Sequence, residues 1–412
     1  MDVAILADDL TGACDTGIQF VEDGFRVCVT WPDDQILPRD SDIGMPENDL
    51  LVWTTTSRSC TAESAELKVG QANLALLQSG RRLIYKKMDS TLRGNVGAEV
   101  DVILATGPHQ LALVCPAFPR LGRRLVVGEL LLGEADQGTG TCLPSLLREQ
   151  SSHAVDRVDV AQVRRGKESL SRRLHQLIAQ GTRVCCVDAE TDADLAILGE
   201  TVSALSPDVL PVGSAGLARE VSRQLAKSVI QAADRTLPWF NDLATKEKLK
   251  DSAAAPIVCF AGSRNPVTVA QLSQFTEELD VKSIQLDRQT PGELVMALDR
   301  GQHVVIRILS EASVQLFLED TLVALAQKTI AGLVLTGGHT AQLVCSAAGA
   351  RGIELRSQVL PGLAEGRLIG GQLQGLSVVT KAGGFGDVDA LLKVCLHLVQ
   401  QYQLKTIASP GS

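Results

Sequence analysis

The chain has 412 residues and a formal net charge of −9, with 45% hydrophobic and 3% aromatic residues. The acidic balance argues against a nucleic-acid or anionic-membrane surface. With so few aromatic side chains, the core must consist of Leu, Val, Ile and Ala, which suits an α/β protein with aliphatic parallel strands. The length favours two domains.

The chain start and the cysteines indicate the compartment. No basic region followed by an apolar stretch opens the sequence, and no uninterrupted apolar run approaches ~20 residues, so we expect a cytoplasmic protein with no membrane partner. The ten cysteines form no C-x-x-C pair, and several lie in apolar runs. We therefore expect buried reduced thiols and no metal site.

Apolar runs that end in polar or Gly-rich turns recur through the first half of the chain. They predict strands at 3–7, 50–54, 82–86, 111–115, 183–187 and 209–212. Amphipathic stretches predict helices at 62–78, 168–179 and 217–232. This alternation is typical of βα units in a mainly parallel sheet. Residues 133–145, with several Gly and a Pro, predict an irregular surface loop.

Two adjacent carboxylates follow the first predicted strand. Asp8 and Asp9 come directly after its apolar run, and Thr11 and Gly12 continue a polar turn at a helix start. Like charges side by side are costly to bury unless cations or hydrogen bonds meet them, so the pair predicts a working site. The alternative is a helix N-cap, with Asp9 or Thr11 capping the helix and the other carboxylate in water.

Cationic side chains follow the next two predicted strands. Arg58 comes after the second strand, and Lys87, Asp89 and Arg93 come at the end of the third. Ligands of open α/β sheets bind at the carboxyl ends of strands, and Arg and Lys suit a carboxylate or phosphate. The sequence therefore predicts an anion site there. The alternative is a solvated turn in which Asp89 caps a helix.

A charged stretch at 236–255 predicts a connector between a domain at 1–235 and a domain at 256–412. Strand-like runs of the second domain lie at 257–261, 303–309, 332–336 and 376–380. The predicted fold class is α/β, as two domains with largely parallel sheets. A cleft between them would be a common location for ligands.

Three Gly-rich turns of the second half each follow a strand and precede a helix, at 262–268, 336–340 and 381–387. Gly lets backbone amides face phosphate oxygens, and the helix dipole favours the negative charge. Three such turns in one domain predict a nucleotide-phosphate site. The chain lacks the G-x-x-x-x-G-K-S/T motif of P-loop NTPases and the protein-kinase motif set.

Together these motifs resemble those of the four-carbon acid sugar kinases, which phosphorylate tetronates such as threonate, erythronate or 3-oxo-tetronate. The resemblance covers essentially the whole chain. It rests on the motifs at 7–17, 56–58, 86–93, 115–119, 213–217, 262–268, 337–340 and 381–386. It implies an N-terminal domain that binds the acid sugar and a C-terminal domain that binds ATP, separated by a substrate/ATP cleft.

Carried onto this sequence, the resemblance implies substrate contacts from Asp8, Asp9, Arg58, Lys87, Asp89 and Arg93. It implies nucleotide contacts from Ser263, Gly337, Gly338, His339, Thr340, Gly383 and Gly384. The expected reaction transfers the γ-phosphoryl of ATP to the terminal C4 hydroxyl of threonate or erythronate, and Asp8 or Asp9 accepts the hydroxyl proton or orients the hydroxyl. Mg²⁺ would rely mostly on phosphate and water ligands. The expected partners are a small-molecule sugar acid and ATP, with a second copy of the chain as a further candidate.

Three other functions stay open at this point. A 3-oxo-tetronate kinase would share the motifs, although the ending at 381–386 is more similar to that of the threonate and erythronate subgroup. A haloacid-dehalogenase-like phosphatase would space its aspartates D-x-D, unlike the adjacent pair here. A non-catalytic sugar-acid or nucleotide sensor is the third, since fold alone does not decide function.

Overall fold

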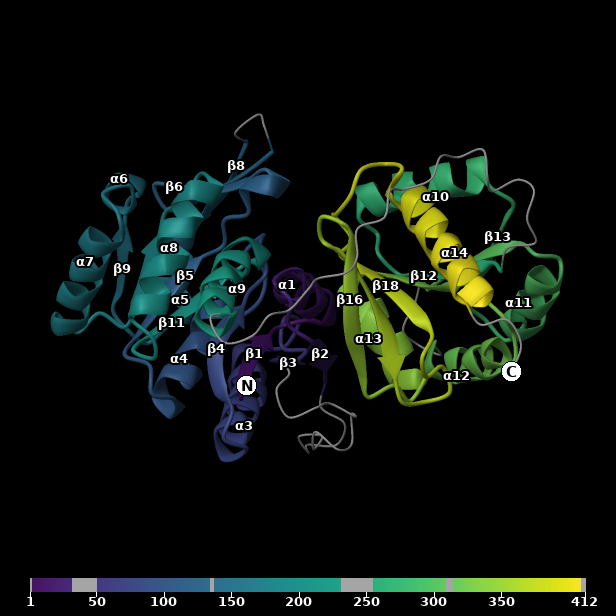
Figure 1. Cartoon of the computed structure of the whole chain (residues 1–412), viewed down its shortest axis with the longest axis horizontal. Coiled ribbons are helices and arrows are strands. Elements are labelled where there is room, and N and C mark those ends of the chain that lie inside the picture. Colours follow the sequence, from purple (N-terminus) through teal and green to yellow (C-terminus); the bar gives the residue numbers. More distant parts are fainter. Residues whose placement is uncertain (1, 32–49, 134–136, 231–254, 309–313, 409–412) are drawn as a thin grey trace. The chain divides into compact units, whose positions relative to one another are not determined.

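The computed structural model describes residues 2–31, 50–133, 137–230, 255–308 and 314–408. The chain divides into two compact units, Met1–Thr236 and Leu237–Ser412 (Figure 1). The predicted connector at 236–255 lies outside the described residues, apart from Ala255. The cleft predicted between the two domains stays a prediction. Within the described ranges, no helix is long and apolar enough to cross a membrane.

Unit 1 contains a parallel sheet of buried, aliphatic strands. Across the sheet the order is β2 (Val27–Thr30), β3 (Leu50–Thr54), β1 (Val3–Ala7), β4 (Arg82–Lys87), β11 (Val209–Gly213), β5 (Leu111–Cys115), β10 (Val184–Val187) and β9 (Val155–Val158). Every neighbouring pair is parallel. The six strands predicted for this half are all present. The predictions missed β2 and β9, which have only four residues each.

The helices of unit 1 form two groups (Figure 1). One group packs in the order α1 (Leu10–Glu22), α9 (Ala215–Ile230), α8 (Asp192–Ala204) and α7 (Lys167–Ala179), with the short α6 (Val160–Val163) beside α7 and α8. The other group is α3 (Ala62–Gln78), α4 (Val96–Thr106) and α5 (Leu143–Gln150). The helices predicted at 62–78, 168–179 and 217–232 are confirmed to within two residues at each end.

The loop predicted at 133–145 is wrong. A separate antiparallel sheet follows the short 3₁₀ helix η1 (Pro119–Leu121) and contains β6 (Arg123–Val126), β7 (Glu129–Leu132) and β8 (Gln137–Cys142). Its Gly residues include Gly133 and Gly140 at positive φ. Pro144 lies in the first turn of α5, where a missing N–H is tolerated. The residues that predicted a loop therefore shape turns and a helix start.

Unit 2 contains a mixed sheet with the order β13 (Val281–Gln285), β14 (His303–Arg307), β12 (Ile257–Ala261), β15 (Gly332–Thr336), β18 (Ser377–Lys381), β17 (Leu363–Ile369) and β16 (Gly352–Leu360). The first five strands are parallel, whereas β17 pairs antiparallel with both neighbours. Helix α10 (Pro266–Glu278) packs on α14 (Ala390–Ala408). Helices α11 (Thr290–Asp299), α12 (Val314–Ala326) and α13 (Gly338–Ala347) pack in sequence. The predicted α/β class with largely parallel sheets is confirmed.

Strand register aligns the functional turns in each unit. Ala7 of β1 pairs with Thr54 of β3 and with Lys87 of β4. In unit 2, Thr336 of β15 pairs with Ala261 of β12 and with Lys381 of β18. Three neighbouring strands therefore end at one edge in each sheet, and the turns that follow them lie side by side, as ligand sites of α/β sheets require.

Candidate active site

Asp8 is held by Arg58 at the end of β1. Arg58 donates from Nε to Asp8 Oδ2 and from Nη2 to Asp8 Oδ1, each at 2.7 Å. Its backbone N–H also donates to the Asp8 carbonyl at 3.2 Å. Burial alone would raise the pKa of Asp8, but the charge and hydrogen bonds of Arg58, together with the charges of Lys87 and Lys86, lower it. Asp8 is therefore an ionised anchor for Arg58, and the expectation that a capped pair leaves one carboxylate in water is wrong.

Asp9 caps helix α1, as the alternative predicted. Its Oδ1 accepts from the Gly12 N–H at 2.8 Å and its Oδ2 accepts from the Thr11 hydroxyl at 2.9 Å. Arg58 Nη2 also lies 2.6 Å from Asp9 Oδ1, so one guanidinium serves both carboxylates. A Cβ on Gly12 would lie 2.5 Å from Asp9 Oδ1 and 2.9 Å from Lys87 Nζ. Glycine is therefore required where α1 faces the cluster.

Asp89 is paired with arginines and caps no helix. Arg93 donates to its two carboxylate oxygens from Nε and Nη2 at 2.8 and 2.9 Å, and Arg58 Nη1 lies 3.5 Å from Asp89 Oδ1. Burial alone would raise the pKa of Asp89, and the two arginines lower it instead. Helix α4 begins after Asn95, so the capping alternative for Asp89 is wrong. The Arg93 side chain is 67% exposed, which leaves this cation reachable from solvent.

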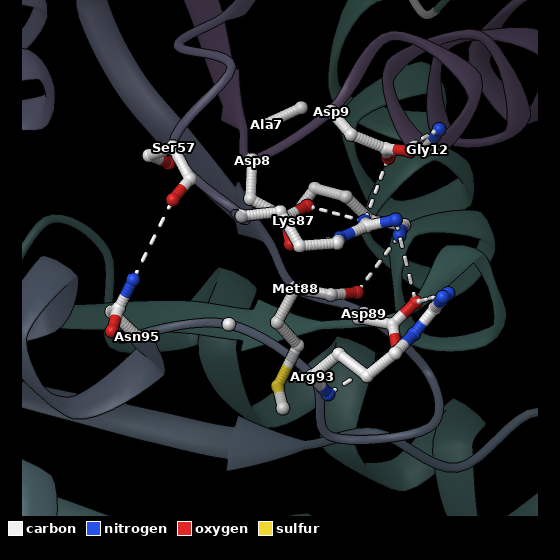
Figure 2. A network of polar contacts seen from close by, with 12 residues as sticks. Ala7, Asp8, Asp9, Gly12, Ser57, Lys87, Met88, Asp89, Arg93 and Asn95 are labelled. Atoms are coloured by element: carbon white, nitrogen blue, oxygen red, sulfur yellow. Dashed lines mark hydrogen bonds and ion pairs between the residues drawn. The ribbon is translucent and has the colours of Figure 1, made fainter. Parts of the chain in front are cut away.

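Lys87 completes the cluster from β4. Its side chain is buried, and Nζ donates to the Met88 carbonyl at 2.8 Å. Neighbouring Lys86 is different, because its Nζ lies 2.5 Å from Glu99 Oε2 in a buried structural pair. The structure gathers the predicted substrate-side residues at the ends of β1, β3 and β4 (Figure 2): Asp8, Asp9, Arg58, Lys87, Asp89 and Arg93.

The Gly-rich turns of unit 2 also converge. A Cβ on Gly383 would collide with the Ser263 hydroxyl, whose oxygen accepts from the Asn265 N–H at 3.2 Å. Gly337 has φ +100°, and a Cβ there would lie 3.6 Å from Ser263 Cβ and 3.5 Å from Thr340 Oγ1. The turns after three strands thus meet where a Cβ on Gly383 would collide and where the backbone of Gly337 has a φ that other residues rarely adopt, as a phosphate cradle requires.

The remaining predicted nucleotide residues flank this point. Gly338 and His339 form the first turn of α13, whose N-terminal N–H groups suit an anion, and the His339 side chain is exposed. A Cβ on Gly384 would lie 3.4 Å from Asn265 Nδ2. The structure therefore brings the predicted nucleotide residues to one edge of the unit 2 sheet.

Lys381 belongs to this turn, and the sequence predictions gave it no role of its own. It is fully buried, and its Nζ donates to Thr268 Oγ1 at 3.2 Å and to the carbonyls of Ala382 and Gly383 at 3.1 and 3.2 Å. Burial lowers its pKa to about 8. A lysine that ends an otherwise uncharged strand is the signal that could have identified it. Its ammonium fixes the carbonyls of the turn.

No group of three or more His, Cys, Asp or Glu side chains in the described part of the chain could hold a metal ion. The carboxylates nearest the anion site are already bound to arginines. These residues fit a Mg²⁺ ion whose ligands are mainly nucleotide phosphates and water.

Comparisons with known proteins place the chain in a family. Residues 3–221 match the family model of a sugar-binding N-terminal domain, and residues 258–391 match that of a nucleotide-binding C-terminal domain. The chain is 33% identical to a D-threonate kinase of Bordetella bronchiseptica over 95% of this chain and 96% of that protein. The chain belongs to the four-carbon acid sugar kinase family. The resemblance predicted from the motifs is confirmed.

Other members of the family have different substrates in their names. A D-erythronate kinase of Heliobacterium modesticaldum is 30% identical over 98% of this chain and 99% of that protein. A 3-oxo-tetronate kinase of Cupriavidus necator is 28% identical over 93% and 94%. A solved Salmonella typhimurium structure, described as a putative tRNA synthase, has a TM-score of 0.72 at 21% identity and covers 95% of this chain and 98% of that one. That likeness concerns the fold alone.

Proposed function

We propose that the chain is a cytoplasmic kinase that transfers the γ-phosphoryl of ATP to the C4 hydroxyl of a four-carbon sugar acid, threonate or erythronate. The observation that carries the proposal is full-length similarity to proteins named D-threonate and D-erythronate kinases. An arginine- and lysine-rich strand edge in unit 1 and a glycine cradle in unit 2 agree with it.

The substrate side contains carboxylates that fix the arginines and cations that would bind the substrate. Asp8 and Asp9 hold Arg58, and Asp89 holds Arg93, so each guanidinium has a fixed position. The outward N–H groups of Arg58 and Arg93, together with Lys87, would hold the substrate carboxylate and hydroxyls. Asp8 and Asp9 would orient the acceptor hydroxyl, which gains its reactivity from alignment more than from covalent help.

The nucleotide side would be the cradle of unit 2. Ser263 and the turns at 337–340 and 383–384 would bind the phosphates through backbone N–H groups, and Lys381 keeps the third turn in place. Bound ATP with its Mg²⁺ supplies the phosphoryl group and neutralises its charge. The residues of the chain supply binding, orientation and exclusion of water.

A 3-oxo-tetronate kinase is the second candidate, because relatives with that name are 26–28% identical over at least 93% of the chain. Threonate or erythronate is favoured because the relatives of 29–33% identity are named D-threonate or D-erythronate kinases, although one D-threonate kinase of Cupriavidus necator is 28% identical. In the phosphatase alternative, an aspartate would have to attack phosphorus. Both oxygens of Asp8 accept hydrogen bonds from Arg58, which argues against this role.

A coupled ADP-release screen with the purified full chain tests the proposal. The acids are the threonate, erythronate and 3-oxo-tetronate isomers, each with ATP and Mg²⁺, beside an acid-free control. We expect turnover of about 1 per second or more with D-threonate or D-erythronate. Turnover confined to a 3-oxo-tetronate would select the second candidate. ADP release that no acid stimulates would contradict both.

A further inference from the structure

Asp15 is a buried carboxylate to which the sequence predictions assigned no role. The site carboxylates Asp8, Asp9 and Asp89 have their oxygens bound by arginines or by the start of α1. Asp15 is 4% exposed, and its Oδ1 receives no hydrogen bond. Buried acceptors are satisfied in most folded proteins, so an orphan one beside a binding cluster calls for an explanation.

Asp15 lies on the face of α1 that meets the cluster. It follows Gly12 by three residues on α1, so the two share one helix face. Gly12 lies against Lys87 Nζ, as shown by the 2.9 Å from its added Cβ to that nitrogen. Four groups act on Asp15 electrostatically: Lys87 and Tyr85 of β4, Arg123 of β6, and Asp9 at the N-cap.

We propose that Asp15 accepts the proton of the acceptor hydroxyl during phosphoryl transfer, an inference that rests on the kinase function proposed above. The acceptor oxygen forms its bond to the γ-phosphorus while the bond from phosphorus to the β,γ-bridging oxygen breaks. The electron pair of that bond leaves with ADP. The hydroxyl proton passes to the Asp15 carboxylate, and Asp8 keeps its bonds to Arg58.

The chemistry favours Asp15 over Asp8. Burial raises the pKa of Asp15 to about 6, although Lys87 and Arg123 attract its charge. Arg58 lowers the pKa of Asp8, which makes that carboxylate a weak base. A general base is most effective when its pKa lies near the operating pH.

The test measures kcat and KM of the full chain from pH 5 to 8 with ATP and the acid that gives the highest turnover. For the wild type we expect an acid limb of kcat/KM near pH 6. Asp15→Asn should lower kcat by about 100-fold or more and abolish the limb, with both KM values changed less than about threefold. Asp15→Glu should recover part of kcat. Thr16→Val is the matched control, because the uncharged Thr16 hydroxyl lies on the same helix and is likewise buried without a hydrogen-bond partner.

Several outcomes would overturn the assignment. Asp15→Asn with kcat within about threefold of wild type would do so, as would a loss of kcat in which the acid limb persists. A wild-type kcat/KM that shows no acid limb between pH 5 and 8 would contradict it even if the variant failed to fold. If the wild type releases no ADP with any acid, the kinase proposal fails first and the Asp15 assignment fails with it.

Discussion

Replacing Asp15 by Asn should stabilise unit 1 at neutral pH while it removes activity. Asn has nearly the shape of Asp and lacks the charge that burial penalises. Folding raises the pKa of Asp15 from 3.8 to about 6. A difference of that size costs the ionised wild type about 3 kcal/mol of folding free energy. Because Asp15 is almost fully buried, solvent screening reduces this little.

The sign of the pH dependence follows from linkage. The folded state binds the Asp15 proton more tightly than the unfolded state, so wild-type stability falls as pH rises from about 4 to about 6 and is constant above. Asp15→Asn should therefore exceed the wild type in free energy of unfolding by up to about 3 kcal/mol at pH 7.5. The difference should shrink toward zero near pH 4, where the wild-type side chain is neutral.

Urea unfolding followed by tryptophan fluorescence measures this difference. Trp31 and Trp53 are buried in unit 1 and report on its transition. Thr16→Val should change stability equally at both pH values, because it carries no charge. An Asp15→Asn variant that is less stable than wild type at pH 7.5, or equally shifted at pH 4 and 7.5, would refute the reasoning.

Three further predictions concern the two binding sites. Arg58→Lys should lower kcat/KM for the acid at least about tenfold, because Lys cannot make the two hydrogen bonds that Arg58 donates to Asp8. Arg164→Lys is the control: it loses a similar two-bond contact to Asp194 outside the cluster and should leave steady-state kinetics unchanged. Gly383→Ala should raise the KM for ATP about tenfold, because the added methyl group would displace the Ser263 hydroxyl. Gly292→Ala, whose Cβ would have no atom within 4 Å, should leave the KM for ATP unchanged. Lys381→Met should raise the same KM about tenfold with the acid KM unchanged, because the turn carbonyls lose a charged donor; a changed acid KM would contradict its place in the nucleotide site.

Most strands and strand ends were predictable, because an aliphatic run followed by a polar turn is typical of a buried strand in a parallel sheet. The positions of Asp8, Arg58 and Lys87 followed from that rule. The antiparallel pair of β16 and β17 was not predicted, since charged and polar residues interrupt the apolar residues of both strands. Local composition likewise pointed to a loop where β8 forms.

The ion pairs and hydrogen bonds within the site could not be predicted from the sequence. The helix-capping rule applied to Asp9, but nothing in the order of residues says that one guanidinium binds Asp8 and Asp9 together. The orphan oxygen of Asp15 depends on packing between α1 and strands remote in the chain. Lys381 was visible as a charge at a strand end, yet its bonds to the turn carbonyls required the folded backbone.

The central claim is phosphoryl transfer to a sugar-acid hydroxyl. ³¹P NMR of a reaction containing the purified chain, ATP, Mg²⁺ and D-threonate or D-erythronate tests it most directly. The account predicts ADP and an equal amount of a phosphomonoester coupled to the protons on C4 of the acid. Inorganic phosphate in place of the ester, or no change in the ATP signals with any tetronate, would contradict it.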